Sequence, residues 1–237
     1  MSSNIGANTT MLISFSGIDG AGKSTQIQNL VSRMQDAGFR IRLITFWDDV
    51  VMLKNLREGA GHKVFKGDKG VGSPEAPIHR RDKNVRSPLM TLFRMAFYFL
   101  DAISLRKVTK QAQHSTADII IFDRYLFDEF ANLDLGNLAI RIYIRALLKL
   151  IPKPAVSFVL DADPVQAFAR KPEYPLDFLH SNRKSYLSLS KIIPGITIIP
   201  PGSIEEAKAR VVECVSQAQT ERHLRAGTTT EPSTLLP

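Results

Sequence analysis

The sequence from position 17 to 25 is Gly-Ile-Asp-Gly-Ala-Gly-Lys-Ser-Thr. It fills the spacing G-x-x-x-x-G-K-[ST], follows an apolar run and precedes a helical pattern, which is the setting this motif requires. Its glycines let the backbone turn tightly and present N–H groups to phosphate oxygens, while the lysine reaches the β- and γ-phosphates. The motif predicts a phosphate-binding loop (P-loop) for ATP and Mg²⁺, made of Gly17, Ile18, Asp19, Gly20, Ala21, Gly22, Lys23, Ser24 and Thr25.

Around this loop the chain alternates short apolar runs with helical patterns. The runs are rich in Ile, Val, Leu and Phe on consecutive positions, which is typical of parallel strands buried on both faces. We expect strands at 11–15, 41–46, 118–122, 156–160 and 196–199. We expect helices at 23–37, 88–113, 139–150, 164–170, 176–191 and 203–217. This alternation predicts an α/β three-layer P-loop fold: a five-stranded parallel sheet with helices on both faces.

The domain prediction is one P-loop kinase domain over 11–220, after a flexible N-terminus at 1–10 and before a disordered tail at 221–237. Residues 59–87 are rich in Gly, Pro and Lys and indicate a long loop insertion. Cys214 is the single cysteine and no signal peptide precedes the domain, so we expect a cytoplasmic protein. No apolar run approaches the roughly 18–20 residues of a membrane span, so none is predicted.

The chain is basic, with a net charge of +8 and a pI near 9.7. Residues 54–88 hold nine basic and four acidic residues, and so carry +5 of that charge. A phosphorylated small-molecule acceptor fits this balance. Nucleic acid is the less favoured partner, because no aromatic side chains are interleaved with the charges.

A second motif, Asp-Ile-Ile-Ile-Phe-Asp-Arg-Tyr, occupies 118–125. Asp123 and Arg124 fall at the carboxyl end of a predicted strand, where ligands of parallel sheets bind. The carboxylate could hold a Mg²⁺-bound water or orient the acceptor, and the arginine could neutralise the transferred phosphoryl group. An ordinary Asp-Arg pair at a strand end is the alternative, and the nearby P-loop favours the functional interpretation.

Together the two motifs resemble the nucleoside monophosphate kinases, and most closely the thymidylate kinases, from about residue 11 to 215. Asp19 matches the acidic P-loop residue of that family, which contacts the acceptor's sugar. Asp123, Arg124 and Tyr125 match its Asp-Arg-Tyr-like motif. Its Leu-Asp-x-Asp-Pro segment and the later aromatic, Arg-then-Tyr-Leu helix are matched by Leu160, Asp161, Asp163 and Pro164, and by Phe178, Arg183, Tyr186 and Leu187.

The resemblance implies ATP–Mg²⁺-dependent transfer to dTMP in nucleotide biosynthesis, by a homodimer. Family members with Gly at position 20 tend to carry the charge-stabilising arginine in a lid, here the short segment 170–176. The implied catalytic residues are Lys23, Asp123, Arg124 and Arg170. The implied metal ligands are Ser24 and Asp123, and the implied lid residues are Arg170, Lys171 and Arg183.

The acceptor half departs from the family. Phe-Trp-Asp-Asp-Val at 46–50 replaces an Arg-Glu-Pro-Gly-Gly-like segment that grips the acceptor phosphate, and Asp101 is followed by Ala102 rather than Arg. The acceptor-binding candidates are Asp19, Phe46, Trp47, Arg94, Asp101 and Tyr125. Two alternatives stay open: a P-loop kinase for another acceptor (a nucleoside, sugar or other metabolite), or an inactive nucleotide-binding regulatory or nucleic-acid-associated protein.

Overall fold

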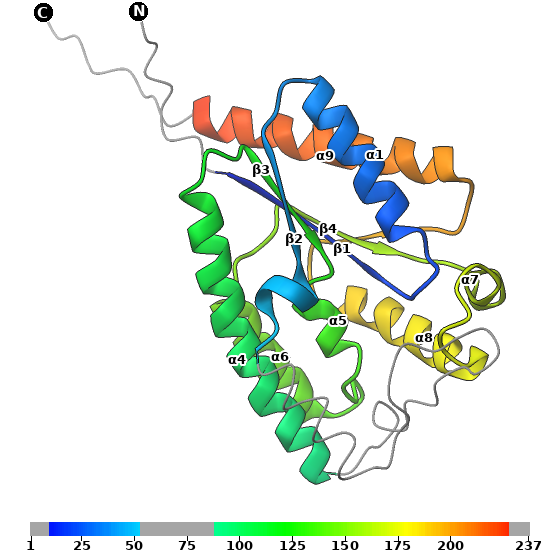
Figure 1. Ribbon diagram of the computed structural model, residues 1–237. Coiled ribbons are helices and arrows are strands. Elements are labelled where there is room, and N and C mark those ends of the chain that lie inside the picture. Colours follow the sequence, from blue (N-terminus) through cyan, green and yellow to red (C-terminus); the bar gives the residue numbers. More distant parts are fainter. Residues whose placement is uncertain (1–9, 53–87, 228–237) are drawn as a thin grey trace, which may run out of the picture.

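The computed structural model describes residues 10–52 and 88–227, which build one sheet flanked by helices (Figure 1). Residues 1–9 of the expected flexible N-terminus (1–10), most of the basic segment with the 59–87 insertion, and the last ten residues of the expected tail lie outside them. The strands are β1 (Met11–Gly17), β2 (Ile41–Thr45), β3 (Ile119–Asp123), β4 (Val156–Leu160) and β5 (Ile196–Ile199). All pair in parallel, in the order β2-β3-β1-β4-β5.

Every residue of β1 and β4 is buried, as expected for central strands covered on both faces. Successive side chains of β1 point to opposite faces of the sheet. Leu12 therefore joins the core under α4, α5, α6 and α8, whereas Ile13 joins the core under α1 and α9. Figure 1 shows these two helical layers on opposite sides of the sheet. The predicted three-layer α/β architecture is confirmed.

The helices lie close to where the sequence predicts them. They are α1 (Lys23–Asp36), α4 (Pro88–Gln113), α6 (Leu138–Leu150), α7 (Pro164–Arg170), α8 (Leu176–Ile192) and α9 (Ile204–Gly227). Helix α9 runs past both the predicted helix end at 217 and the predicted domain end at 220, so 221–227 are helical rather than tail. Two five-residue elements were not predicted: the π-helical turn η1 (Phe46–Val50) and α5 (Leu126–Phe130). Phe46 consequently belongs to η1 rather than to β2.

Helix α4 is the one described helix that is long and apolar enough to cross a membrane by length and composition alone. Its most apolar window has a mean hydropathy of 1.3 and is 22% buried. A single helix that meets this criterion is weak evidence for a membrane span. Leu89, Leu92 and Phe93 near its start are exposed.

Candidate functional site

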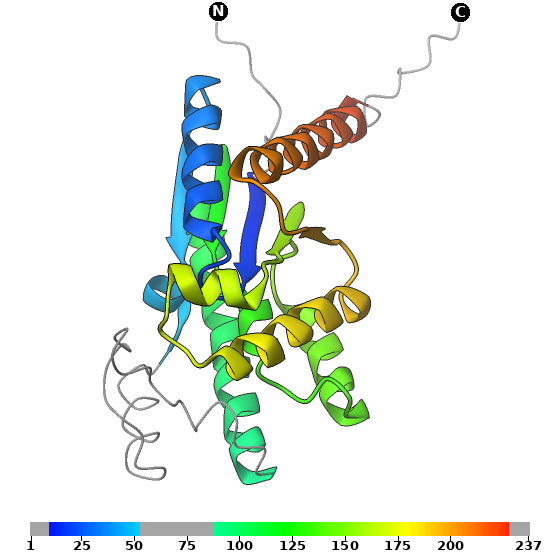
Figure 2. The same ribbon diagram turned by 90° about the vertical axis from the view of Figure 1, so that its right-hand side faces the viewer.

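The P-loop joins the carboxyl end of β1 to the first turn of α1. Gly20 has a φ of +80°, and a Cβ at this position would overlap the carbonyl oxygen of Ala167 in α7. Only glycine fits there, because α7 packs directly against the loop backbone; Figure 2 shows α7, in yellow-green, crossing the ends of β1 and α1. Gly22 also has positive φ, but a Cβ there would meet open space. The loop is therefore uncovered where the helix N-terminus can receive an anion.

Lys23 lies beneath this loop. Its Nζ donates hydrogen bonds to the carbonyl oxygens of Gly17 (2.9 Å) and Ile18 (2.8 Å), and the residue is only 7% exposed. The pKa of the ammonium group is lowered to about 8: burial and, to a lesser extent, the positive charge of Arg124 lower it, and together they outweigh the carboxylates of the site, which raise it. Ser24 and Thr25, the next two residues, are exposed at the start of α1.

The second motif is brought to the P-loop by strand pairing, since Asp123 lies in register with Phe15 on the neighbouring strand β1. Arg124 follows with a left-handed φ of 66°, and its backbone N–H donates to the carbonyl of Phe15 (2.9 Å). Its guanidinium forms an ion pair with Asp19 of the P-loop. Burial lowers the pKa of Arg124, but the carboxylates of Asp128 and Asp19 outweigh that effect and raise it. The two motifs thus form one site.

The sequence did not point to Asp128, which holds this site together. Its carboxylate is almost fully buried and accepts hydrogen bonds from Ser16 Oγ (2.6 Å), the Tyr125 N–H (3.0 Å), Arg124 Nη1 (3.1 Å) and Tyr186 Oη (2.7 Å). The clue in the sequence was the pair of acids Asp128 and Glu129 between apolar residues at 126–130, because a buried carboxylate requires partners.

Comparison with known proteins finds relatives of this chain by sequence. No family model matches the chain. It is 33% identical over 167 residues to a thymidylate kinase of Chlorobaculum tepidum, covering 68% of this chain and 66% of the relative. It is 25% identical over 200 residues to a probable thymidylate kinase of Methanosphaera stadtmanae, covering 83% of this chain and 92% of the relative. The chain is thymidylate kinase-like.

Solved structures agree on the fold of this thymidylate kinase-like chain. The thymidylate kinase of Ehrlichia chaffeensis superposes with a TM-score of 0.53 at 19% identity, covering 88% of this chain and 99% of that one. The thymidylate kinase of Candida albicans gives a TM-score of 0.56 at 19% identity, covering 89% and 93%.

Three of the predicted acceptor-binding residues of the thymidylate kinase-like chain are buried inside the fold. Phe46, Asp101 and Tyr125 are each 0% exposed. The Asp101 carboxylate accepts the Met52 N–H (2.9 Å), and the Tyr125 hydroxyl donates to the carbonyl of Pro152. The fold commits these side chains to buried packing and hydrogen bonds, and their contact with an acceptor stays a prediction.

The other acceptor candidates keep some solvent access. Trp47 is half-buried, with its ring edge-on to that of Phe46, and Arg94 is half-buried on α4. Asp19 lies in the P-loop, paired with Arg124. The carboxyl end of β2, where the family grips phosphate, instead presents the exposed acids Asp48 and Asp49.

Of the three predicted lid residues, two are exposed and one is held in an ion pair with the end of β4. Arg170 is exposed at the end of α7, one turn beyond the contact between Ala167 and the P-loop, and Lys171 is exposed and paired with Glu173 (3.2 Å). Arg183 instead forms a two-pronged ion pair with Asp161 at the end of β4 (Nε–Oδ1 2.6 Å, Nη2–Oδ2 2.8 Å). In this structure it therefore docks α8 onto the sheet rather than facing the P-loop.

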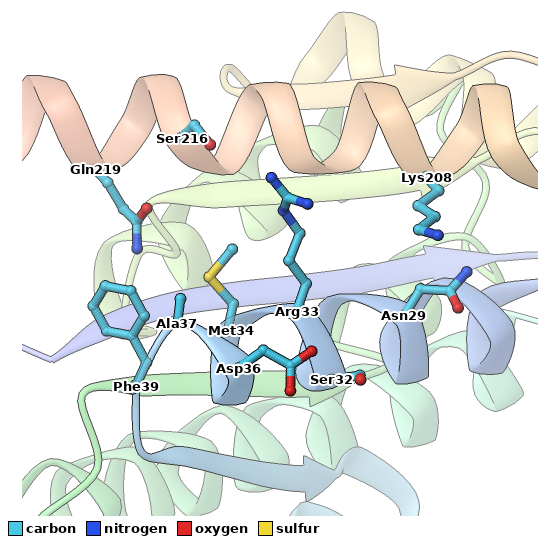
Figure 3. Close-up of a pocket in the computed structure, with 10 residues that line it drawn as sticks. All are labelled: Asn29, Ser32, Arg33, Met34, Asp36, Ala37, Phe39, Lys208, Ser216 and Gln219. Carbon is cyan, nitrogen blue, oxygen red and sulfur yellow. The ribbon is translucent and has the colours of Figure 1, made fainter.

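A cavity of about 620 Å³ lies elsewhere, between α1 and α9. Figure 3 shows Arg33 and Lys208 extending into it from the two helices, beside Asn29 and Gln219. No P-loop residue lines it, so it is separate from the site formed by the two motifs.

Proposed function

We propose that this protein transfers the γ-phosphoryl group of ATP to a nucleoside monophosphate, with dTMP + ATP → dTDP + ADP as the best single reaction. The observation that carries the proposal is the Arg124–Asp19 ion pair, which joins the P-loop and the Asp-Arg motif of a thymidylate kinase-like chain in one site. We also propose a cytoplasmic setting, in keeping with the single cysteine.

In the proposed reaction, a phosphate oxygen of the acceptor attacks the γ-phosphorus, and the bond to the β–γ bridging oxygen breaks to release ADP. The P-loop amides and the N-terminus of α1 would hold the triphosphate. Lys23 is already beneath the loop and would turn its ammonium from the carbonyls of Gly17 and Ile18 toward the β- and γ-phosphates. Arg124 would clamp donor and acceptor, and exposed Arg170 would supply charge from the lid. Positioning and electrostatics account for the rate in such sites.

The residues fit a Mg²⁺ ion held mainly by substrate. Among residues 10–52 and 88–227 no three His, Cys, Asp or Glu side chains form a metal cluster. Mg²⁺ at nucleotide sites needs only one or two protein oxygens beside phosphates and water. Ser24, exposed at the start of α1, and Asp123, partly exposed at the end of the adjacent β3, offer such oxygens. When bound, Mg²⁺ would supply positive charge that offsets the negative charge developing on the transferred phosphoryl group.

The test is an ADP-release assay with ATP–Mg²⁺ against a panel of nucleoside monophosphates that includes dTMP and dUMP. We expect turnover with at least one of them, and its loss in Lys23→Ala while that variant still unfolds in a cooperative thermal transition. Lys208→Ala, on the distant helix α9, is the matched control and should keep wild-type turnover. Undiminished activity in Lys23→Ala would contradict the assignment.

A second candidate is a kinase whose acceptor carries no phosphate where the acceptor meets the end of β2, such as a nucleoside. It is favoured by Asp48 and Asp49, whose exposed carboxylates would repel an acceptor phosphate at the end of β2 and could instead accept hydrogen bonds from hydroxyl groups. Nucleosides added to the same panel distinguish the two. Turnover with a nucleoside and none with its monophosphate would establish this alternative.

We also propose that the protein is a homodimer. Helix α4 exposes large apolar side chains at helical spacing: Leu89, Leu92, Phe93, Phe99 and Ile103. An exposed apolar stripe of this kind is typical of an interaction surface. Light scattering should give twice the chain mass of 26.4 kDa, and Phe93→Glu should shift it toward the monomer. A monomeric wild type at micromolar concentration would contradict the dimer.

A further inference from the structure

We infer that Asp128 is the positioning residue for Arg124, fixing its guanidinium against the P-loop and linking that placement to β1 and α8. The inference rests on the proposed function, because it assigns Arg124 a role in phosphoryl transfer. It concerns a residue outside both sequence motifs.

The first argument is the number and origin of the groups around this carboxylate. Oδ1 accepts from Arg124 Nη1 (3.1 Å) and Tyr186 Oη (2.7 Å), and Oδ2 accepts from Ser16 Oγ (2.6 Å) and the Tyr125 N–H (3.0 Å). These donors come from β1, from the end of β3 and from α8. A buried carboxylate with four donors has one orientation available, so it can serve as a fixed reference for the arginine.

The second argument is what Asp128 does to Arg124. The guanidinium is planar and places one terminal nitrogen on Asp128 and the other on Asp19. Asp19 is in the P-loop, beside the phosphates that the loop would bind, so its hold on Arg124 must compete with substrate. The Asp128 side chain is only 3% exposed, so its ion pair with Arg124 does not compete with substrate. If Asp128 lost its charge, the guanidinium would keep only the contact with Asp19 and could rotate.

The third argument concerns α8. Tyr186 reaches Asp128 from this helix, and the Arg183–Asp161 ion pair fixes the same helix to β4. Helix α8 begins at Leu176, the last residue of the lid segment 170–176. The Tyr186 hydroxyl therefore connects α8 to Arg124, because both donate to the Asp128 carboxylate. Loss of this hydroxyl should disturb the placement of Arg124 less than loss of the negative charge of Asp128.

A double-mutant cycle tests the inference on whichever acceptor the panel identifies. Asp128→Asn should lower kcat about 10- to 100-fold and leave KM for ATP within about threefold, because the arginine is misplaced while the P-loop is intact. In an Arg124→Ala background the same substitution should change kcat by less than about threefold, since a positioning residue has no effect without its target. Equal losses in both backgrounds would overturn the inference and leave Asp128 a structural residue.

Two further measurements keep the result decisive. Asp118→Asn is the matched control: it removes a carboxylate from another arginine pair (with Arg40, 2.8 Å) at the opposite end of β3, and should keep wild-type kcat. If thermal unfolding shows that Asp128→Asn is not folded, Tyr186→Phe replaces it in the cycle. The expected loss of kcat is then about threefold to tenfold.

If wild type transfers phosphate to no acceptor, the proposed function fails and the inference is judged separately. ¹⁵N-arginine NMR of the full chain should show slow rotation of the Arg124 guanidinium in wild type and fast rotation in Tyr186→Phe or Asp128→Asn. Slow rotation in both variants would refute the positioning role without reference to activity.

Discussion

Raising the pH from 7 to 9.5 should weaken ATP binding and, through the same group, stabilise the ligand-free protein. The group is Lys23, whose ammonium is buried beneath the P-loop with a pKa of about 8 instead of 10.5. A group with that pKa is about 90% protonated at pH 7 and about 3% protonated at pH 9.5. Because only the ammonium form pairs with phosphate, affinity for an ATP analogue should fall about 30-fold over this range.

The stability effect has the opposite sign. Between pH 8 and 10.5 the unfolded chain holds a proton on Lys23 that the folded chain lacks. The unfolded state then binds more protons, so the free energy of unfolding rises with pH. From pH 7 to 9.5 the gain assigned to this group is about 2 kcal/mol.

Titration calorimetry with a non-hydrolysable ATP analogue and Mg²⁺ measures the first effect, and urea unfolding without ligand measures the second. Other groups titrate in this range, so the stability change is taken as wild type minus Lys23→Met. In Lys23→Arg the charge persists, and affinity should be nearly independent of pH. An affinity in wild type that stays flat to pH 9.5, or a stability difference that falls with pH, would refute the reasoning.

Three other substitutions test the packing around the site by urea unfolding. Gly20→Ala should cost about 2–5 kcal/mol because its Cβ overlaps a carbonyl of α7, whereas Gly38→Ala, with similar φ and open space, should cost about 1–2 kcal/mol; equal costs would rule out close packing of α7. Arg183→Gln should lower the free energy of unfolding by only about 1 kcal/mol, because the ion pair with Asp161 is partly exposed, and it should loosen α8 from the end of β4. A rate of proteolysis in α8 that equals the wild-type rate would contradict this. Tyr125→Phe should cost about 1–2 kcal/mol and leave acceptor KM unchanged, since its hydroxyl is buried against a backbone carbonyl; a raised KM would return this residue to the acceptor site.

The features that the sequence predicts well are those that depend on neighbouring residues. The P-loop is a contiguous motif, and the buried strands appear as local apolar runs, so Lys23 and the sheet could be placed from spacing alone. Asp123 and Arg124 could be assigned to the same edge as the P-loop because parallel strands share a carboxyl end. The structure adds the register between Phe15 and Asp123 that makes them neighbours.

The acceptor side could not be predicted because it depends on distant contacts. Asp128 has its role through Ser16 and Tyr186, which lie 112 and 58 positions away along the chain. Polar residue type alone was also a poor guide to substrate contact. Asp101 looked like a substrate ligand but satisfies a buried backbone N–H, and Tyr125 turned its hydroxyl inward to a loop carbonyl.

The contact between Gly20 and α7 restricts how this protein could change over evolutionary time. The resemblance to thymidylate kinases implies that some members place an arginine at this P-loop position, but here any side chain would enter space occupied by the α7 backbone. A single codon change to arginine would therefore damage the fold before it could supply a charge. The helix would have to move first, by an insertion or deletion between β4 and α8, and that change would alter the lid that carries Arg170. The two placements of the arginine are thus separated by intermediates of low fitness, and a lineage that has adopted one is expected to keep it.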